Sequence, residues 1–155
     1  MSLSILERVL FLQCAELFKH VPSDDLSPVA QIAEEVYFEA GELIIAEGEL
    51  GDSLYLIVDG EVSIQIHSLG EVAKRVSRET LGELAIISRE PRTADCVCLT
   101  DVTALRITYE DFWELLDIKQ SLALGVIQVL SSRLDEALIT LRDLNAKVDA
   151  NVVQR

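Results

Sequence analysis

The apolar positions of the chain change their period along the sequence. From Ser4 to about Lys19 they recur at helical spacing, and a second short helix is expected over 24–33, with Ser23 or Asp24 as its cap. Over 34–108, β-branched and aromatic runs alternate with glycine-containing turns roughly every eight to ten residues. Each turn glycine is expected to supply a positive φ. This spacing predicts short antiparallel strands in a barrel or roll.

Helical spacing returns after Thr108, which is placed to cap a helix with Asp111 three residues on. A long helix is then expected from Ser121 towards Val148. Its apolar positions follow steps of four and three residues, which is a heptad seam: Leu130, Leu134, Ala137, Leu141, Leu144 and Val148. The seam predicts pairing with a second copy of the chain. The alternative is that the stripe packs on this chain's own roll.

These patterns predict an α+β, mainly β fold. The expected architecture is an antiparallel double-stranded β-helix, a jelly-roll-like β-roll, flanked by N-terminal helices and a long C-terminal helix. We divide the chain into an N-terminal helical segment (1–33), the roll (34–108) and the C-terminal helices (109–155), all within one globular domain.

Charge and composition narrow the classes of function. The chain has 27 acidic and 13 basic residues and a formal charge of −14, which repels DNA and acidic membranes, so direct nucleic-acid binding is not expected. No apolar run reaches the length of a membrane span, and the N-terminus is typical of an amphipathic helix rather than a signal peptide, so no direct membrane insertion by this chain is expected.

Cysteine and histidine usage argues against catalysis and metal binding. Cys14, Cys96 and Cys98 are expected to be buried, reduced thiols. Reduced thiols favour a cytoplasmic location. The chain could also be the cytosolic domain of a larger protein, including a membrane protein. His20 and His67 are far apart in sequence, and no Ser-His or Cys-His signature is present. We therefore expect no catalytic residues, no metal and no cofactor: the chain is not an enzyme.

The segment Leu81–Ala94, LGELAIISREPRTA, contains the residues most suited to binding a ligand. Gly82, Glu83, Leu84 and Ala85 can begin a short helix whose free N–H groups bind an anion. Arg92 adds a planar fork of donors suited to phosphate oxygens. Glu83 can accept a hydrogen bond from a sugar hydroxyl. Together these residues indicate a pocket for a nucleotide.

This segment resembles the phosphate-binding cassette of cyclic nucleotide-binding domains, the family found in protein kinase A regulatory subunits, the bacterial catabolite activator protein and cyclic nucleotide-gated channels. The Gly-Glu-Leu-Ala and Pro-Arg-Thr-Ala groups stand at the family spacing. Upstream, the turn residues of the family's β-roll are matched by Gly41, Gly48, Gly51-Asp52, Tyr55 and Gly60. The resemblance runs from about Leu17 to Leu138.

The resemblance implies a role for each residue of the segment. Arg92 would pair with the cyclic phosphate and Glu83 with the ribose 2′-OH, while Gly82 would allow close backbone approach. Leu84 and Ala85 would offer N–H groups and turn their side chains inward. Thr93 could bond a guanine amino group. The implied ligand-binding set is Gly82, Glu83, Leu84, Ala85, Arg92, Thr93 and Ala94.

Two functions remain open at this point. The first is a regulatory domain for cAMP or cGMP that signals through its C-terminal helix, to a second copy as a homodimer or to a fused or partner effector domain. That helix would close over the base as a lid through Leu122, Leu124, Val126 or Ile127. The second is a degenerate, ligand-free dimerisation or interaction module of the same fold. It is motivated by the acidic surface, by the charged approach 76–80 and by Asp95, whose carboxylate could face the phosphate.

Overall fold

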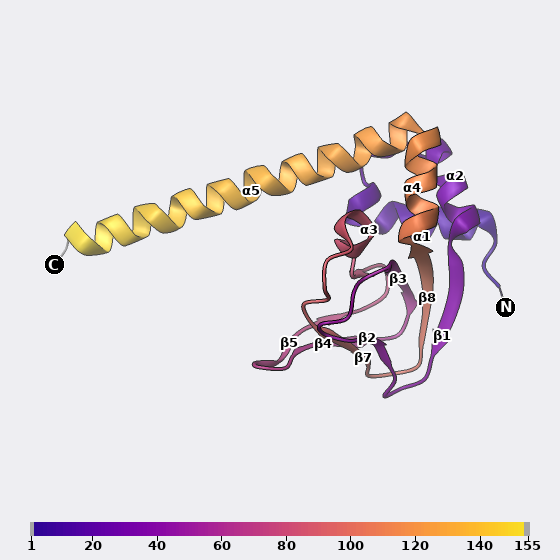
Figure 1. The fold of residues 1–155 in the computed structure, drawn as a ribbon, viewed down its shortest axis with the longest axis horizontal. Helices are drawn as coiled ribbons and strands as arrows, with labels where there is room; N and C mark the ends of the chain where they lie inside the picture. The colour runs from indigo at the N-terminus through magenta and orange to yellow at the C-terminus, as the bar shows by residue number, and fades with distance from the viewer. Residues whose placement is uncertain (1, 154–155) are drawn as a thin grey trace.

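The computed structural model describes residues 2–153, and within them eight strands form two four-stranded antiparallel sheets (Figure 1). The first sheet has the order β1-β8-β3-β6 and the second β2-β7-β4-β5. The strands are β1 (Glu34–Phe38), β2 (Leu43–Ile45), β3 (Ser53–Asp59), β4 (Val62–Ile66), β5 (Gly70–Arg75), β6 (Thr80–Leu81), β7 (Asp95–Cys98) and β8 (Val102–Thr108). Consecutive strands alternate between the sheets except for β4 and β5, which form a hairpin within the second sheet, so the predicted β-roll is confirmed.

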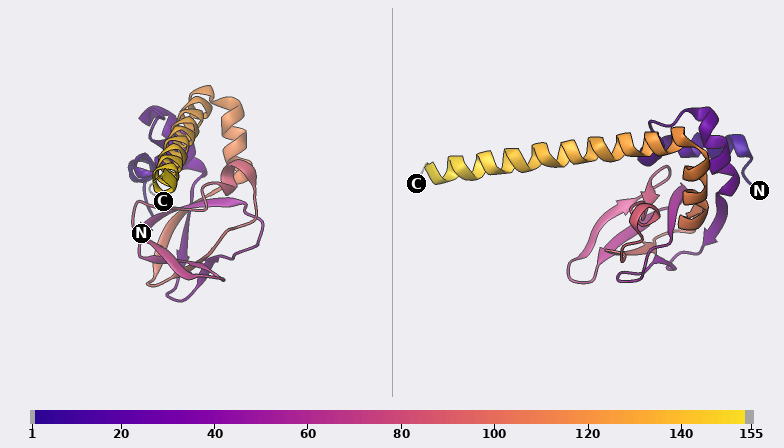
Figure 2. Two further views of the ribbon diagram at one scale, coloured as in Figure 1. Left: turned by 90° about the vertical axis from the view of Figure 1, so that its left-hand side faces the viewer. Right: turned by 45° about the horizontal axis from the view of Figure 1, so that its top comes forward.

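The helices gather at one end of the roll, where β8 leads into α4 (Figures 1 and 2). They are α1 (Ile5–Cys14), the 3₁₀ turn η1 (Glu16–Phe18), α2 (Ser23–Ile32), α3 (Ala85–Ser88), α4 (Tyr109–Ile118) and α5 (Gln120–Val153). The predicted N-terminal helices and the long C-terminal helix are present. Thr108 caps α4 as predicted, because its hydroxyl accepts from the N–H of Asp111 at 3.2 Å.

Two apolar cores hold the molecule together. The larger core lies where the helices meet the first sheet, and Phe18, Leu26, Leu105 and Phe112 are fully buried in it. The smaller core fills the roll between the two sheets, around Ile57, Val62 and Ala104. The candidate site lies beside both, since Ile86 of α3 belongs to the larger core and Leu81 of β6 to the smaller.

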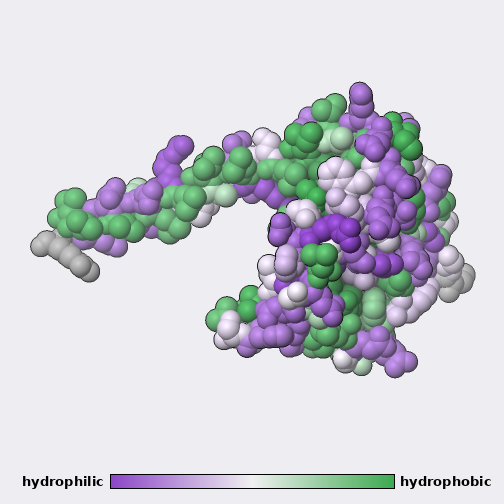
Figure 3. Space-filling view, in the orientation of Figure 1, coloured by the Kyte–Doolittle hydropathy of each residue, from purple (hydrophilic) through white to green (hydrophobic). Residues whose placement is uncertain are grey.

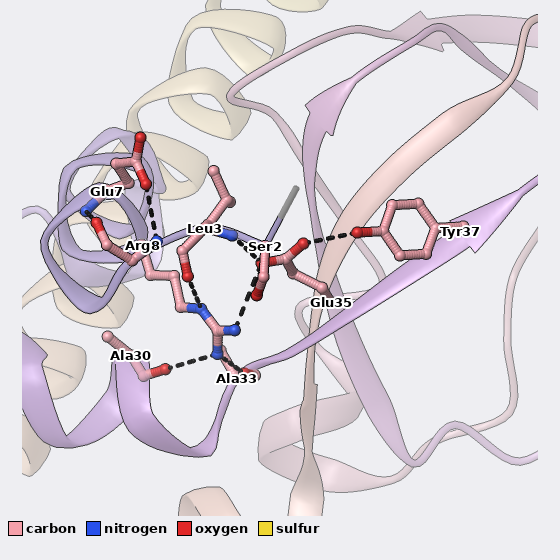
Figure 4. A network of polar contacts seen from close by, with 9 residues as sticks. Ser2, Leu3, Glu7, Arg8, Ala30, Ala33, Glu35 and Tyr37 are labelled. Atoms are coloured by element: carbon pink, nitrogen blue, oxygen red, sulfur yellow. Dashed lines mark hydrogen bonds and ion pairs between the residues drawn. The ribbon is translucent and has the colours of Figure 1, made fainter.

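Arg8 fastens the N-terminal segment to the roll (Figure 4). Its guanidinium donates to the carbonyls of Ala30 and Ala33 at the end of α2, and pairs with Glu35 of β1 at 3.4 Å. Glu35 also accepts from the Leu3 N–H and from the Tyr37 hydroxyl. The pKa of Glu35 is held below its usual range because these hydrogen bonds outweigh the effect of burial. The network therefore fixes α1 against α2 and the first sheet.

Helix α5 is anchored only at its start. Leu122, Val126 and Val129 are buried, and Gly125 lies so close to Val21 that a Cβ would be 2.7 Å from its Cγ2 atom. From Leu134 to Val153 every residue is exposed, and this part projects away from the body (Figure 3). Beyond Leu130 the apolar seam is thus not covered by this chain's own roll.

Several local predictions were wrong. The first helix ends at Cys14 rather than near Lys19, because Ala15 is extended and a separate 3₁₀ turn follows, burying Leu17 and Phe18. Pro22, not Ser23 or Asp24, precedes the second helix as its cap residue. Cys14 is exposed, whereas Cys96 and Cys98 are buried as expected. Strands β5 and β6 were not foreseen, since β5 is an exposed edge strand without apolar alternation.

Candidate functional site

The segment between β6 and β7 forms a short arm across one side of the roll. It leaves the first sheet where Leu81 pairs with Tyr55 of β3, and enters the second sheet at Asp95. The arm is fastened to the loop between β2 and β3, because the Arg92 N–H donates to the Glu49 carbonyl at 2.7 Å and the Gly48 N–H donates to the Arg92 carbonyl at 2.8 Å. The backbone of Arg92 is therefore held from both directions.

Two cavities flank the guanidinium of Arg92 and share five lining residues, Arg75, Thr80, Gly82, Arg92 and Thr93. The larger has a volume of about 530 Å³, which is within the range of small-molecule sites. Gly82, Glu83, Leu84, Ala85, Arg92 and Thr93 all line it, and Ala94 lines the smaller cavity of about 170 Å³. The structure thus brings all seven predicted site residues together.

Arg92 is half-buried and donates to two backbone carbonyls. Its Nη1 lies 3.2 Å from the Gly82 oxygen and its Nη2 lies 2.7 Å from the Ser53 oxygen. Within residues 2–153 it forms no ion pair with a carboxylate, although the chain has twice as many acidic as basic residues. Burial lowers the pKa of Arg92 from its ordinary value, yet a guanidinium stays protonated at neutral pH. The site therefore holds, beside a cavity, a positive charge that no carboxylate of the described residues pairs directly.

The short helix α3 begins at Ala85, after a turn through Gly82 at φ +68°. The Ala85 N–H, which the sequence predicted to be free, donates to the Gly82 carbonyl at 3.2 Å. The N–H groups of Glu83 and Leu84 donate to no atom of the described residues and remain available for an anion. The Ala85 side chain is buried as predicted, but Leu84 is 62% exposed, which contradicts its predicted inward packing.

Glu83 is held by groups on both sides of its carboxylate. Its Oε1 lies 2.6 Å from Nη1 of Arg133 on α5, and its Oε2 accepts from the Thr80 hydroxyl at 3.2 Å. Burial lowers the pKa of Arg133, but its hydrogen bonds and ion pairs with Glu83 and Glu16 outweigh this and raise it. Arg133 is a site contact that the sequence analysis missed, because it lies far along the chain on a different element.

Two glycines make room for the guanidinium of Arg92. A Cβ on Gly82 would clash with Nη1 of Arg92, and the positive φ of Gly82 also disfavours any side chain there. A Cβ on Gly51 would clash with Ala85 and lie 3.0 Å from Nε of Arg92. Gly51 has no positive φ, so its role is close packing, contrary to the prediction that each turn glycine supplies one.

Asp95 points away from the cavities. Its Oδ1 accepts from the Glu47 N–H at 2.7 Å, and its Oδ2 lies 2.9 Å from Nε2 of His67. The first of these hydrogen bonds, with help from His67, lowers the pKa of Asp95 below its usual value. His67 also pairs with Glu47 through Nδ1 at 2.8 Å. The Asp95 carboxylate, which the sequence analysis suspected of facing the phosphate, therefore binds the backbone at Glu47 and the His67 ring instead.

Among the remaining lining residues, Glu90 is an exposed acid on the larger cavity, and the others described next are donors or neutral. Thr93 lines both cavities with an exposed side chain. Cys96 lines the smaller cavity, and burial raises the pKa of its thiol to about 11, so it is uncharged at neutral pH. Arg75 and Thr80 also line both cavities, although the sequence motif does not contain them. Arg75 stands out in the sequence only as part of a small group of basic residues.

The proposed lid residues do not reach these cavities. Leu122 and Val126 are buried in the helical core, while Leu124 and Ile127 are each 59% exposed, and none of the four lines either cavity. Besides the ion pair between Arg133 and Glu83, the helices contact the arm through Trp113 of α4, whose Nε1 donates to the Ile86 carbonyl at 2.9 Å. Arg89, which ends α3, lies 5.1 Å above the ring of Tyr109.

Comparisons with known proteins agree on one family. The family model described as "Cyclic nucleotide-binding domain" matches residues 35–119. A cAMP-dependent protein kinase regulatory subunit from Eremothecium gossypii is 30% identical over 106 residues, which are 68% of this chain and 23% of that protein. The cGMP-dependent protein kinase 2 of Homo sapiens is 32% identical over 108 residues, covering 66% of this chain and 14% of that protein.

A solved structure shows the same fold. The N-terminal domain of a transcriptional regulator from Streptomyces coelicolor A3(2) superposes with a TM-score of 0.76 at 25% identity, covering 81% of this chain and 90% of that one. The chain spans less than a quarter of the length of the two curated relatives named above. Among the described residues, none of the helices has the length and apolar character needed to cross a bilayer, and no cluster of potential ligands for a metal ion was found.

Proposed function

The chain belongs to the cyclic nucleotide-binding domain family, and we propose that it binds cAMP or cGMP in the cavities beside Arg92 as a regulatory domain. One observation carries the proposal. Arg92 is a half-buried guanidinium without a carboxylate partner among the described residues, and it lies at the wall of a cavity of about 530 Å³. Such a charge is most strongly stabilised by an anionic ligand.

The phosphate would bind between Arg92 and the turn before α3. Arg92 uses two of its N–H groups on carbonyls, which leaves donors of the same fork for phosphate oxygens. The free N–H groups of Glu83 and Leu84 add two donors at the start of α3. A monoanionic cyclic phosphate matches one guanidinium and two amides in charge and in hydrogen bonding.

The sugar and base would occupy the rest of the cavities. Glu83 lines the larger cavity and has acceptor capacity left for a ribose 2′-OH. Thr93 and Arg75 line both cavities, where Arg75 offers donors to a purine edge and the Thr93 hydroxyl can both donate and accept.

Isothermal titration of the protein with cAMP and cGMP, with 5′-AMP as a control ligand, tests this function. Because a charge-assisted hydrogen bond contributes about 1.5–3 kcal/mol, Arg92→Gln should weaken binding by at least about tenfold. Arg142→Gln removes the same charge from the exposed part of α5 and should leave the affinity unchanged. If no cyclic nucleotide binds at millimolar concentration, or if Arg92→Gln binds as tightly as the wild type, the proposal is wrong.

A ligand-free interaction module is the second candidate. It is favoured by the observation that Arg92 and Glu83 are both already bonded within the protein, to two carbonyls and to Arg133. The orientation of Asp95 removes one reason for preferring it, because that carboxylate does not face the cavities. The same titration separates the candidates: a stable protein that releases no heat and shows no thermal shift with either nucleotide would support this module.

We further propose that the chain signals as a homodimer through α5. The exposed apolar side chains beyond Arg133 include Leu134, Leu141, Leu144 and Val148, each more than half exposed, at the heptad steps of the predicted seam. A second α5 is the partner whose spacing matches this seam over its whole length. The three free cysteines agree with a cytoplasmic setting, alone or within a larger protein.

Light scattering coupled to size-exclusion chromatography tests the dimer. Leu141→Glu introduces a charge into the seam and should convert a dimer into a monomer, whereas Arg142→Glu introduces the same residue beside the seam and should leave the dimer intact. A wild-type protein that is monomeric at high concentration, or a dimer that survives Leu141→Glu, would contradict this assembly.

A further inference from the structure

Arg133 joins three parts of the molecule that are distant in sequence. Its Nε lies 3.3 Å from Oε1 of Glu16 in η1, and its Nη1 lies 2.6 Å from Oε1 of Glu83 in the arm before α3. The side chain is 24% exposed, and every residue of α5 after it is exposed. Arg133 is therefore the last point at which α5 is bound to the body of the domain.

The ion pairs of Arg133 with Glu16 and Glu83 offset a local excess of negative charge. Glu16, Glu79 and Glu83 line one cavity of about 420 Å³ beside Arg75 and Arg78, in a chain whose net charge is −14. Without Arg133, the carboxylates of Glu16 and Glu83 would lose the cation that they share. Repulsion between the two carboxylates would then favour movement of the Glu83 side chain away from its present position.

We propose that Arg133 is a positioning residue for recognition of the ribose 2′-OH, acting by orienting the carboxylate of Glu83. This inference rests on the proposed function. Thr80 holds one oxygen of Glu83 and Arg133 the other, and an ionised carboxylate has about four acceptor positions, so capacity for a sugar hydroxyl remains. In this orientation Glu83 lines the larger cavity.

The contact between Glu83 and Arg133 also links binding of the sugar to the attachment of α5. A ligand that hydrogen-bonds to Glu83 favours the orientation in which Glu83 holds Arg133, and it thereby stabilises the attachment of α5. By linkage, whatever fixes α5 in this position must increase the affinity for the ribose by the same factor. The sugar contact therefore acts on α5 through ion pairs, whereas the arm contacts α4 through Ile86 and Trp113.

The ratio of affinities for a ribonucleotide and its 2′-deoxy analogue tests the proposal. Titrations with cAMP and 2′-deoxy-cAMP, or with the corresponding guanine pair, should show a ratio of about tenfold or more in the wild type. Arg133→Gln should bring this ratio close to one. Arg133→Lys should keep part of it, because an ammonium can pair with Glu83 but lacks the planar fork that also reaches Glu16. Arg142→Gln is the matched control and should keep the full ratio.

A purely structural role for Arg133 would weaken the binding of both nucleotides equally and leave the ratio unchanged, which would overturn the proposal. Hydrogen exchange without nucleotide gives an independent measurement. Arg133→Gln and Glu83→Gln should each accelerate exchange of the amides around both 80–88 and 130–137, and the double variant should add little. Independent, additive effects would overturn the coupling. If the wild type binds no cyclic nucleotide, the proposed function and the ribose role both fail, and this exchange experiment alone decides whether Arg133 couples the arm to α5.

Discussion

Substitution of Gly82 offers a test of the site that separates ligand binding from stability. Alanine at this position has two consequences: it places a side chain at φ +68°, and its Cβ clashes with Nη1 of Arg92. The first should cost about 1–2 kcal/mol of folding free energy. The second displaces the free end of a long side chain, so its main cost is the hydrogen bond from Arg92 to the Gly82 carbonyl, about 1 kcal/mol.

Gly41 provides the matched control for this substitution. It has φ +90°, and a Cβ there would have no atom within 4 Å, so Gly41→Ala carries the backbone cost without the clash. Urea unfolding at one protein concentration should therefore show Gly82→Ala less stable than Gly41→Ala by about 1 kcal/mol. Both variants should remain folded.

Binding should differ far more than stability. Displacement of the Arg92 guanidinium would remove the proposed phosphate contact, so Gly82→Ala should lose at least about tenfold in affinity for cAMP or cGMP, whereas Gly41→Ala should bind as the wild type does. Titration calorimetry measures both. If Gly82→Ala matched Gly41→Ala in stability and also bound normally, the close approach of Arg92 to Gly82 would have no functional meaning and the reasoning would be refuted.

Three further outcomes are expected. Thr93→Ala should lower the affinity for cGMP by about fivefold if the hydroxyl bonds the guanine amino group, with little change for cAMP in parallel titrations; equal losses for both ligands would argue against that contact. The pKa of Asp95 is lowered in the folded protein, so its contribution to stability is present above the ordinary aspartate pKa of about 3.9 and is lost as the pH falls through the folded value. The difference in unfolding free energy between wild type and Asp95→Asn should therefore shrink on acidification, and a difference constant down to pH 2 would refute this. Trp113→Phe should destabilise the protein by about 1 kcal/mol through the lost bond to Ile86, as measured by urea unfolding, and no change would show that this link between α3 and α4 is unimportant.

The elements that depend on neighbouring residues were predictable from the sequence, whereas those fixed by distant contacts were not. The apolar runs of β3 and β8, the alternation of β4 and the cap at Thr108 depend on neighbouring residues, and these elements form within the parts of the chain where the sequence predicts strands and a helix start. The first helix stops early for a non-local reason, since Leu17 and Phe18 must turn into the core shared with α4 and α5. Edge strand β5 is held by its hydrogen bonds to β4, and its mostly polar, exposed side chains give no sequence pattern that predicts a strand.

In the site, some contacts depend on nearby residues and others on residues far away in the sequence. The spacing of Gly82 and Arg92 is a local pattern that the sequence displays, and the two residues are in contact because the arm between them folds back on itself. The partners of Glu83 and Asp95 come from elsewhere in the chain, and no motif encodes Arg133 or His67 in those roles. For Asp95 the distant partner corrects the sequence interpretation, since a carboxylate suspected of repelling phosphate is bound to a loop and a histidine instead. For Glu83 it adds to the interpretation, because the residue expected to bind the sugar also holds the helix expected to carry the signal.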